Sequence, residues 1–112
     1  LTEVPRSINQ LMNEIGESAD SIQHLILHQA NQLLSDLIAK KTGFGKDQTP
    51  SSLHQYGNTS CATIPVTLVT QMNHKLESGK RKLLLSGFGV GLSWANAFIT
   101  TDTIVCPEVL EE

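Results

Sequence analysis

Residues 22–41, with the sequence IQHLILHQANQLLSDLIAKK, decide the fold of this 112-residue chain. The segment from Ile22 to Leu27, apolar except for Gln23 and His24, has no helical period and is long enough for a buried strand. From Ala30 onward, apolar residues recur on one helical face, and Gly43 follows the last of them. A nearly all-apolar strand that leads into an amphipathic helix predicts a sheet covered by helices, which is an α/β layer architecture.

Further elements are predicted on both sides of this stretch. Before it, Pro5 occupies a first helical turn, and apolar residues then keep a helical spacing up to Ile15. After it, the residues from Thr42 to Ser52 are rich in turn formers and predict a loop. Residues 52–56 are predicted as a short strand.

The C-terminal half predicts one more helix and two more strands. Thr59 and Ser60 supply capping hydroxyls for a helix that ends at Gly79. The segments after it are predicted as a strand over residues 82–86, a glycine-rich turn over residues 87–91 and a strand over residues 92–101. We expect the helix after Asn58 to lie on the sheet. Its outer face is predicted to carry Ala62, Thr63, Val66, Thr67 and Thr70.

Composition and charge exclude two classes of function. Eight Lys and Arg residues against eleven Asp and Glu give a net charge of −3, which is too balanced for general nucleic-acid binding. The longest apolar runs are three residues long, so we expect no membrane span, no signal-peptide core and a cytoplasmic location. Because acidic residues gather at the C-terminus, we expect a domain of residues 1–101 and an acidic tail of residues 102–112.

The cysteines and histidines do not indicate a metal site. Cys61 and Cys106 form no C-x-x-C pair, and the four histidines are scattered along the chain. We therefore expect no metal and no cofactor.

Three short motifs lie where the predicted elements meet. His28 follows the buried strand, in the region where α/β sheets bind ligands, although a structural histidine gives the same pattern. Asn58 follows Gly57 in a turn before a helix, and it is either a helix cap or an amide projected into a site. Residues 87–91, GFGVG, lack the spacing of a dinucleotide-binding turn but allow the backbone to approach a ligand closely.

Together and in this order, the three motifs resemble the C-terminal half of the β-ketoacyl-acyl-carrier-protein synthase III family, condensing enzymes of the thiolase superfamily. The resemblance covers residues 5–101 and rests on HQAN at 28–31, GNTS at 57–60 and GFGVG at 87–91, followed by Trp94. It implies a thiolase-like α/β fold with helices layered on a mixed sheet. It also implies decarboxylative condensation of an acyl-coenzyme A primer with malonyl-acyl carrier protein in fatty acid synthesis.

The resemblance also implies roles for individual residues. The family's active site is a Cys-His-Asn set, in which His28 and Asn58 match the histidine and the asparagine. Both would donate N–H groups to the thioester oxygen, where negative charge develops during decarboxylation. The backbone N–H of Val90 would help to form an oxyanion hole, and Asn31 and Phe88 would line the pantetheine tunnel.

The nucleophilic cysteine of the family lies in the N-terminal half, and neither Cys61 nor Cys106 matches it. The resemblance therefore implies that this chain alone is inactive and that its partners include the N-terminal half of the same enzyme. It also implies a homodimer at full length. Lys40 and Lys41 match residues that dock acyl carrier protein, although a solvated helix end gives the same pattern.

Two other functions fit the same residues. One is a related starter synthase of polyketide or secondary metabolism, which takes a different acyl chain. The other is a non-catalytic binding module that retains the fold. If the sequence upstream of this chain held a second α/β repeat with a cysteine at the start of a helix, that would favour a condensing enzyme or a starter synthase over the binding module.

Overall fold

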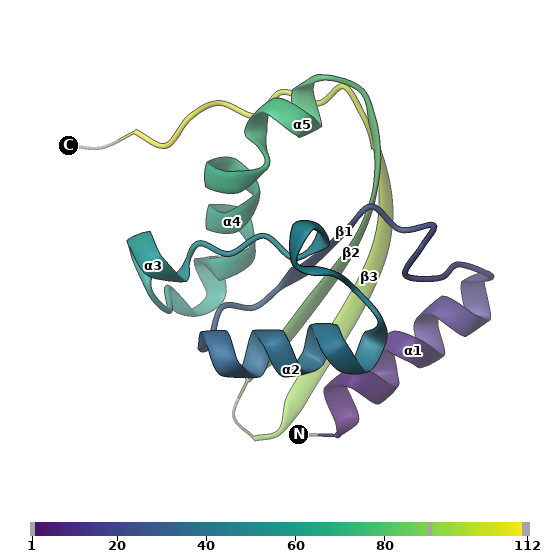
Figure 1. Ribbon diagram of the computed structural model, residues 1–112. Helices are drawn as coiled ribbons and strands as arrows, with labels where there is room; N and C mark the ends of the chain where they lie inside the picture. The colour runs from purple at the N-terminus through teal and green to yellow at the C-terminus, as the bar shows by residue number, and fades with distance from the viewer. Residues whose placement is uncertain (1, 90, 111–112) are drawn as a thin grey trace.

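Three strands form the centre of the molecule, and helices pack on both sides of them (Figure 1). The computed structural model describes residues 2–89 and 91–110. Along the chain the elements are α1 (Glu3–Ile15), β1 (His24–Leu27), α2 (Gln32–Thr42), the 3-10 turn η1 (Lys46–Gln48), α3 (Leu53–Tyr56), the 3-10 turn η2 (Ser60–Ala62), α4 (Thr63–Gln71), α5 (Asn73–Glu77), β2 (Lys80–Gly89) and β3 (Ser93–Asp102).

The sheet is mixed, with β2 between its two neighbours. Strand β1 runs parallel to β2, with His24 opposite Leu83, and β3 runs antiparallel to β2, with Ser93 opposite Gly89. All four residues of β1 are buried, as the apolar run in the sequence predicts. The predicted α/β class, with helices layered on a mixed sheet, is confirmed.

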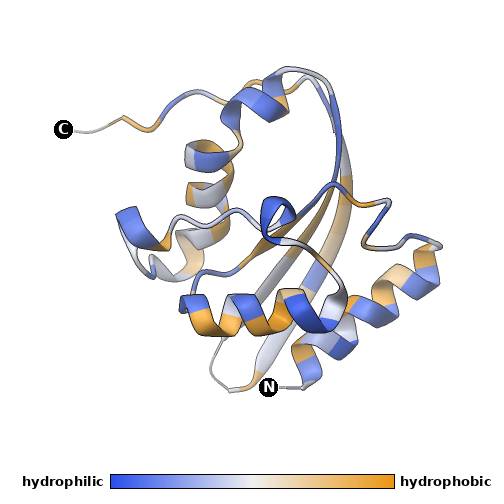
Figure 2. Cartoon of the chain, viewed as in Figure 1, coloured by the Kyte–Doolittle hydropathy of each residue, from blue (hydrophilic) through white to orange (hydrophobic). Residues whose placement is uncertain are grey.

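Two apolar clusters hold the helices on opposite faces of the sheet. One cluster joins α1 and α2 to Leu84 of β2, and the other joins α5 and the end of α4 to Leu83. Because successive side chains of a strand point to opposite faces, these two neighbouring leucines anchor different layers. Figure 2 shows hydrophobic residues along the strands, between the two helical layers.

Helix α2 begins at Gln32, slightly later than the apolar stripe predicts, because Asn31 is its cap. Asn31 has an extended backbone, and its side-chain oxygen accepts a hydrogen bond of 2.8 Å from the N–H of Leu34. The helix ends at Gly43, whose φ of 85° is the left-handed conformation that glycine adopts most readily.

The strand predicted for residues 52–56 is wrong. The segment Leu53–Tyr56 is the short helix α3, because the carbonyl of Ser52 accepts hydrogen bonds from the N–H groups of Gln55 and Tyr56. These contacts close a helical turn, and in the described part of the chain no strand pairs with this segment.

The helix predicted up to Gly79 is divided into three shorter pieces. After the turn η2, helix α4 ends at Gln71, and Met72 interrupts the helix with φ −122° and ψ −2° before α5 begins. The prediction of a helix that packs on the sheet is correct, but its continuity is not. Met72 is buried at the break, so packing of its side chain outweighs the regular helical backbone there.

The predicted outer face of this helix is also wrong in part. Thr63 and Thr67 are only 1% and 0% exposed, so they lie on the inner face of α4. Both hydroxyls find hydrogen-bond partners inside the protein, which removes the usual cost of burying a polar group. An apolar stripe alone does not predict such an inward hydroxyl pair.

Strand β2 is longer than the sequence predicts and takes up most of the expected glycine-rich turn. Gly87 and Gly89 pair with Ala95 and Ser93 of β3, so the ladder continues almost to the turn between the strands. Glycine has no side chain to prevent this pairing, although it disfavours an isolated strand.

The first residues after β3 pack against α5 and its surroundings. The N–H of Ile104 donates to the carbonyl of Leu76 at 3.1 Å, and Cys106 is buried in the cluster around Met72. The division into a domain of residues 1–101 and a tail of residues 102–112 stays a prediction. Among the described residues, no helix is long and apolar enough to cross a membrane.

Candidate active site

One cavity of about 750 Å³ opens where β1 ends, where η2 leads into α4, and where β2 approaches β3. Residues from all three sequence motifs lie in its walls, namely His28, Asn58 and the stretch Gly87–Gly89. The prediction that these motifs converge on one cleft is therefore confirmed.

His28 lies directly after β1 and is half-buried. Its backbone N–H donates to the carbonyl of Ser86 at 2.9 Å, which extends the pairing of β1 with β2 by one residue. The ring nitrogen Nδ1 lies 2.6 Å from Oγ1 of Thr63, and the ring meets Phe88 edge to face, with centroids 5.3 Å apart. Burial lowers the pKa of His28, which favours a neutral imidazole.

Asn58 stands in a turn that only glycine can begin. Gly57 has φ 63° and ψ −154°, a backbone conformation that essentially only glycine adopts. The restriction comes from the backbone alone, because a Cβ at this position would meet no neighbouring atom within 4 Å. The side-chain oxygen of Asn58 accepts a hydrogen bond of 2.9 Å from the N–H of Ser60. The amide oxygen is therefore occupied, and the NH₂ group is the part of the side chain left to interact with a ligand.

Phe88 lies in the cavity wall, where its ring packs edge to face against the imidazole of His28. Its predicted role in a pantetheine tunnel stays a prediction. Val90, whose backbone N–H is predicted to help form an oxyanion hole, lies outside the described residues.

The structure does not bring Asn31, Lys40 or Lys41 to the cavity. Asn31 is exposed and caps α2, so its side-chain oxygen is engaged with the helix. Lys40 and Lys41 are exposed in the last turn of α2. Their position suits both a docking surface and a favourable interaction with the helix dipole, so their predicted role stays a prediction.

Several residues in the cavity wall were not singled out from the sequence as site residues, and Thr63 and Cys61 are the two considered for its chemistry. Thr63 contacts His28 across 35 positions of sequence, and no local pattern indicates such a distant pair. Cys61 is exposed and lines the cavity, three residues after Asn58. That short spacing is the signal that could have placed Cys61 at the site.

The polar groups of the cavity wall suit recognition of an oxygen rather than a metal ion. In residues 2–89 and 91–110, no three His, Cys, Asp or Glu side chains lie close enough together to hold a metal. A neutral imidazole and a carboxamide NH₂ group can both donate hydrogen bonds. Donors of this kind stabilise an oxygen on which negative charge develops.

Comparison with known proteins gives a consistent result. The model of the C-terminal domain of 3-oxoacyl-[acyl-carrier-protein] synthase III matches residues 12–101. The β-ketoacyl-[acyl-carrier-protein] synthase III of Streptococcus sanguinis is 40% identical over 103 residues, which are 89% of this chain and 32% of that protein. The corresponding protein of Lactococcus lactis subsp. cremoris is 37% identical over 99 residues, which are 87% and 30% of the two chains.

The fold is shared with solved structures as well. The crystal structure of 3-oxoacyl-(acyl-carrier protein) synthase from Burkholderia xenovorans superposes with a TM-score of 0.89 and 33% identity, over 95% of this chain and 31% of that one. This chain therefore spans about a third of the length of the relatives that it matches.

Proposed function

This chain belongs to the 3-oxoacyl-[acyl-carrier-protein] synthase III family as its C-terminal domain, and we propose that it supplies two catalytic residues to a decarboxylating condensing enzyme. The complete enzyme transfers an acyl group from coenzyme A to a cysteine and condenses it with malonyl-acyl carrier protein. His28 and Asn58 act in the second half-reaction. The cysteine comes from the N-terminal part of the same enzyme.

The second half-reaction needs hydrogen-bond donors that carry no negative charge. Loss of CO₂ from the malonyl thioester leaves an enolate, whose negative charge rests largely on the thioester oxygen. The enolate carbon then attacks the acyl-cysteine carbonyl, and the cysteine thiolate leaves. Two N–H donors lower the energy of the enolate, whereas a carboxylate at either position would raise it.

One observation supports this role most directly. Each of the two side chains in the cavity has its other polar atom engaged by the protein: Nδ1 of His28 with Thr63, and the amide oxygen of Asn58 with the N–H of Ser60. Nε2 of His28 and the NH₂ group of Asn58 are thereby left for a substrate oxygen. Because His28 and Asn58 line the same cavity, both remaining donor groups are available to a single ligand there.

The partners follow from the same proposal. Acyl-coenzyme A and malonyl-acyl carrier protein are the substrates, and the full-length enzyme is a homodimer. Lys40 and Lys41, exposed at the end of α2, contribute positive charge for docking the acidic carrier protein. Asn31 and Phe88 line the tunnel for the pantetheine arm, and the backbone N–H of Val90 helps to form the oxyanion hole.

The proposal is tested with Asn58→Ala in the full-length synthase that contains this chain. We expect malonyl decarboxylation to fall about 100-fold, which is typical for loss of one donor to a developing oxyanion. Acylation of the nucleophilic cysteine is expected to stay within about three-fold, because the enolate forms only in the later step. Radiolabelled CO₂ release and mass spectrometry of the acyl-enzyme measure the two half-reactions separately. An equal loss of both would mean that Asn58 maintains structure only.

The chain by itself is expected to take up no acyl group from acyl-coenzyme A. The Cys106 thiol is buried, and burial raises its pKa, which disfavours the reactive thiolate. Cys61 lines the cavity, but among the described residues no hydrogen bond joins it to His28 or to another base. Mass spectrometry of the chain after incubation with acyl-coenzyme A is expected to show the unmodified mass. Alkylation of Cys61 by iodoacetamide is the positive control, and a stoichiometric acyl adduct on Cys61 would contradict the prediction.

A further inference from the structure

We propose that Thr63 is a positioning residue that holds His28 in the tautomer with its proton on Nε2. This inference rests on the proposed function and deepens it, because it explains how the imidazole is set as a donor toward the cavity. It concerns a residue that lies at the start of α4, far from the sequence motif that contains His28.

The contact between the two residues is short and sheltered. Oγ1 of Thr63 lies 2.6 Å from Nδ1 of His28, and Thr63 is only 1% exposed. Either atom of this pair can be the donor in principle, since the donor of a histidine depends on its tautomer. The direction of the hydrogen bond therefore has to come from the other partners of the threonine hydroxyl.

The Thr63 hydroxyl has one acceptor, and the other hydroxyls of this network are bonded among themselves. The hydroxyl of Thr67 donates to the backbone carbonyl of Thr63 at 2.8 Å, and the same Thr67 oxygen lies 2.8 Å from Oγ of Ser52. Because Thr67 has already donated its single proton, Ser52 must be the donor in that second contact. Within the described residues, the Thr63 hydroxyl itself has no partner other than Nδ1 of His28.

The two tautomers of His28 therefore differ in energy. If Nδ1 carried the proton, it would donate to Thr63, and the threonine O–H would remain buried without an acceptor, which is costly. If Nδ1 accepts the threonine proton, both groups are satisfied and the imidazole proton resides on Nε2. The geometry thus selects the tautomer that can donate toward the cavity.

The neighbouring network keeps Thr63 in place relative to His28. The backbone N–H of Ser52 donates to the side-chain oxygen of Gln29, and the NH₂ group of Gln29 donates to the carbonyl of Leu27. These bonds connect the two chain neighbours of His28 to α4 through Ser52 and Thr67. The histidine and its threonine partner are therefore held by one continuous set of buried hydrogen bonds.

The test uses Thr63→Val, which keeps the shape of threonine without its hydroxyl, and Thr63→Ser, which keeps the hydroxyl, in the full-length synthase. ¹⁵N-histidine NMR reports which ring nitrogen carries the proton, and His28→Gln assigns the His28 signals. We expect wild type and Thr63→Ser to show the Nε2–H form, and Thr63→Val to show a mixture. Thr63→Ala serves the same purpose if the valine variant does not fold.

Two kinetic measurements accompany the spectra. Malonyl decarboxylation is expected to fall about ten-fold in Thr63→Val, the effect of one ordinary hydrogen bond, and less than two-fold in Thr63→Ser. The acid limb of the pH profile of decarboxylation is expected to move to higher pH in Thr63→Val. The threonine hydroxyl stabilises the neutral ring by donating to Nδ1, so its loss raises the pKa of His28.

The outcomes separate this inference from the proposed function. If His28 remains in the Nε2–H form in Thr63→Val, the inference is overturned, whatever the rate. If the tautomer becomes mixed while decarboxylation is unchanged, the role of Thr63 stands, and the proposed role of His28 as a donor is wrong. A mixed tautomer together with slower decarboxylation supports both.

Discussion

Replacing His28 by alanine in the full-length synthase is expected to slow malonyl decarboxylation about 1,000-fold, the upper end of the effect of removing one oxyanion donor. The upper end is expected because the ring also packs edge to face against Phe88 and closes one side of the cavity. Its removal admits water to the place where the enolate oxygen forms, and water weakens the remaining hydrogen bond from Asn58. Acylation of the cysteine is expected to change less than about ten-fold.

The measurement is single-turnover kinetics of each half-reaction, with His54→Ala as the matched control. His54 lies on α3, is exposed and is not one of the residues that line the cavity, so its replacement is expected to leave both half-reactions unchanged. A His28→Ala enzyme that decarboxylates at the wild-type rate would contradict the mechanism. A variant that loses both half-reactions together would show a structural histidine.

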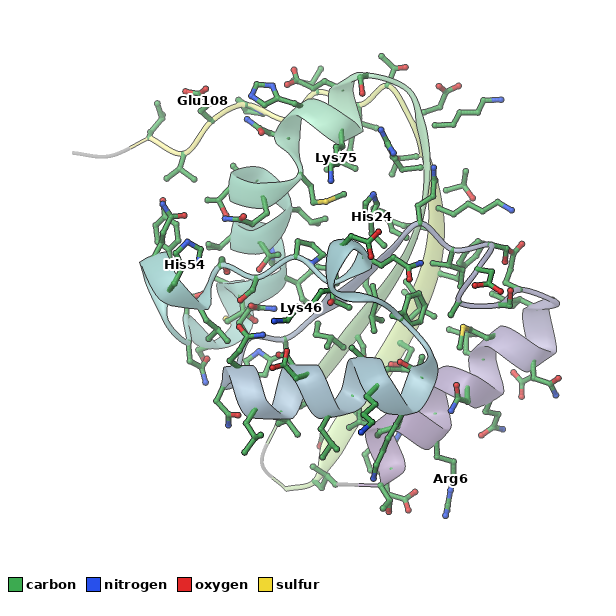
Figure 3. The ribbon with its side chains drawn as sticks, viewed as in Figure 1. Arg6, His24, Lys46, His54, Lys75 and Glu108 are labelled. Carbon is green, nitrogen blue, oxygen red and sulfur yellow. The ribbon has the colours of Figure 1, made fainter. Side chains whose placement is uncertain are left out.

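Mild acid is expected to destabilise the chain through His24, the first residue of β1. His24 is 6% exposed, and in the described residues both of its ring nitrogens are buried without a hydrogen-bond partner. Burial, together with the positive charges of Lys75 and Arg81, lowers the pKa of His24 from 6.5 to about 4, and Asp47 opposes this weakly. Figure 3 shows Lys75 of α5 beside His24.

The direction of the pH effect follows from proton binding. Between pH 6.5 and about 4 the unfolded chain binds a proton at His24 that the folded chain does not. The contribution of His24 to the free energy of unfolding is therefore fully present above pH 6.5 and is lost as the pH falls towards 4. The loss reaches about 3 kcal/mol near pH 4, at about 1.4 kcal/mol for each pH unit.

Urea unfolding of the chain between pH 7 and pH 4 measures this loss. The variant His24→Leu is expected to remove most of the acid dependence, whereas His74→Gln, at an exposed histidine, is expected to retain it. The same slope in wild type and His24→Leu would show that carboxylates, and not His24, cause the acid instability.

The secondary structure that depends on local patterns was predictable from the sequence. The apolar run before His28 became a strand buried on both faces, and the stripe after Asn31 became a helix, because each pattern buries a continuous apolar surface. The prediction failed at residues 52–56, where a backbone turn closed by Ser52 outweighs the weak strand preference of its residues. It also failed at Met72, where long-range packing interrupts a helix.

The candidate site was predictable only where a motif carried it. His28 and Asn58 were chosen from their motifs, and the fold brings both to one cavity. Thr63 was placed on the wrong face, since threonine on a helix is normally assigned to the solvent side. Its inward orientation depends on a partner 35 residues away, and the sequence alone holds no signal for such a contact.

The pairing of β1 with β2 has a consequence for how the protein acquires its shape in time. These parallel strands are joined across a separation of 59 residues, as in the hydrogen bond from the N–H of Lys82 to the side chain of Gln23. Contacts at such separation form slowly, because the intervening chain must lose its freedom before they contribute energy. During synthesis, β1 leaves the ribosome well before β2, its partner strand, has been made. We therefore expect the cavity between His28 and Gly87 to form late in folding, because its walls depend on this pairing.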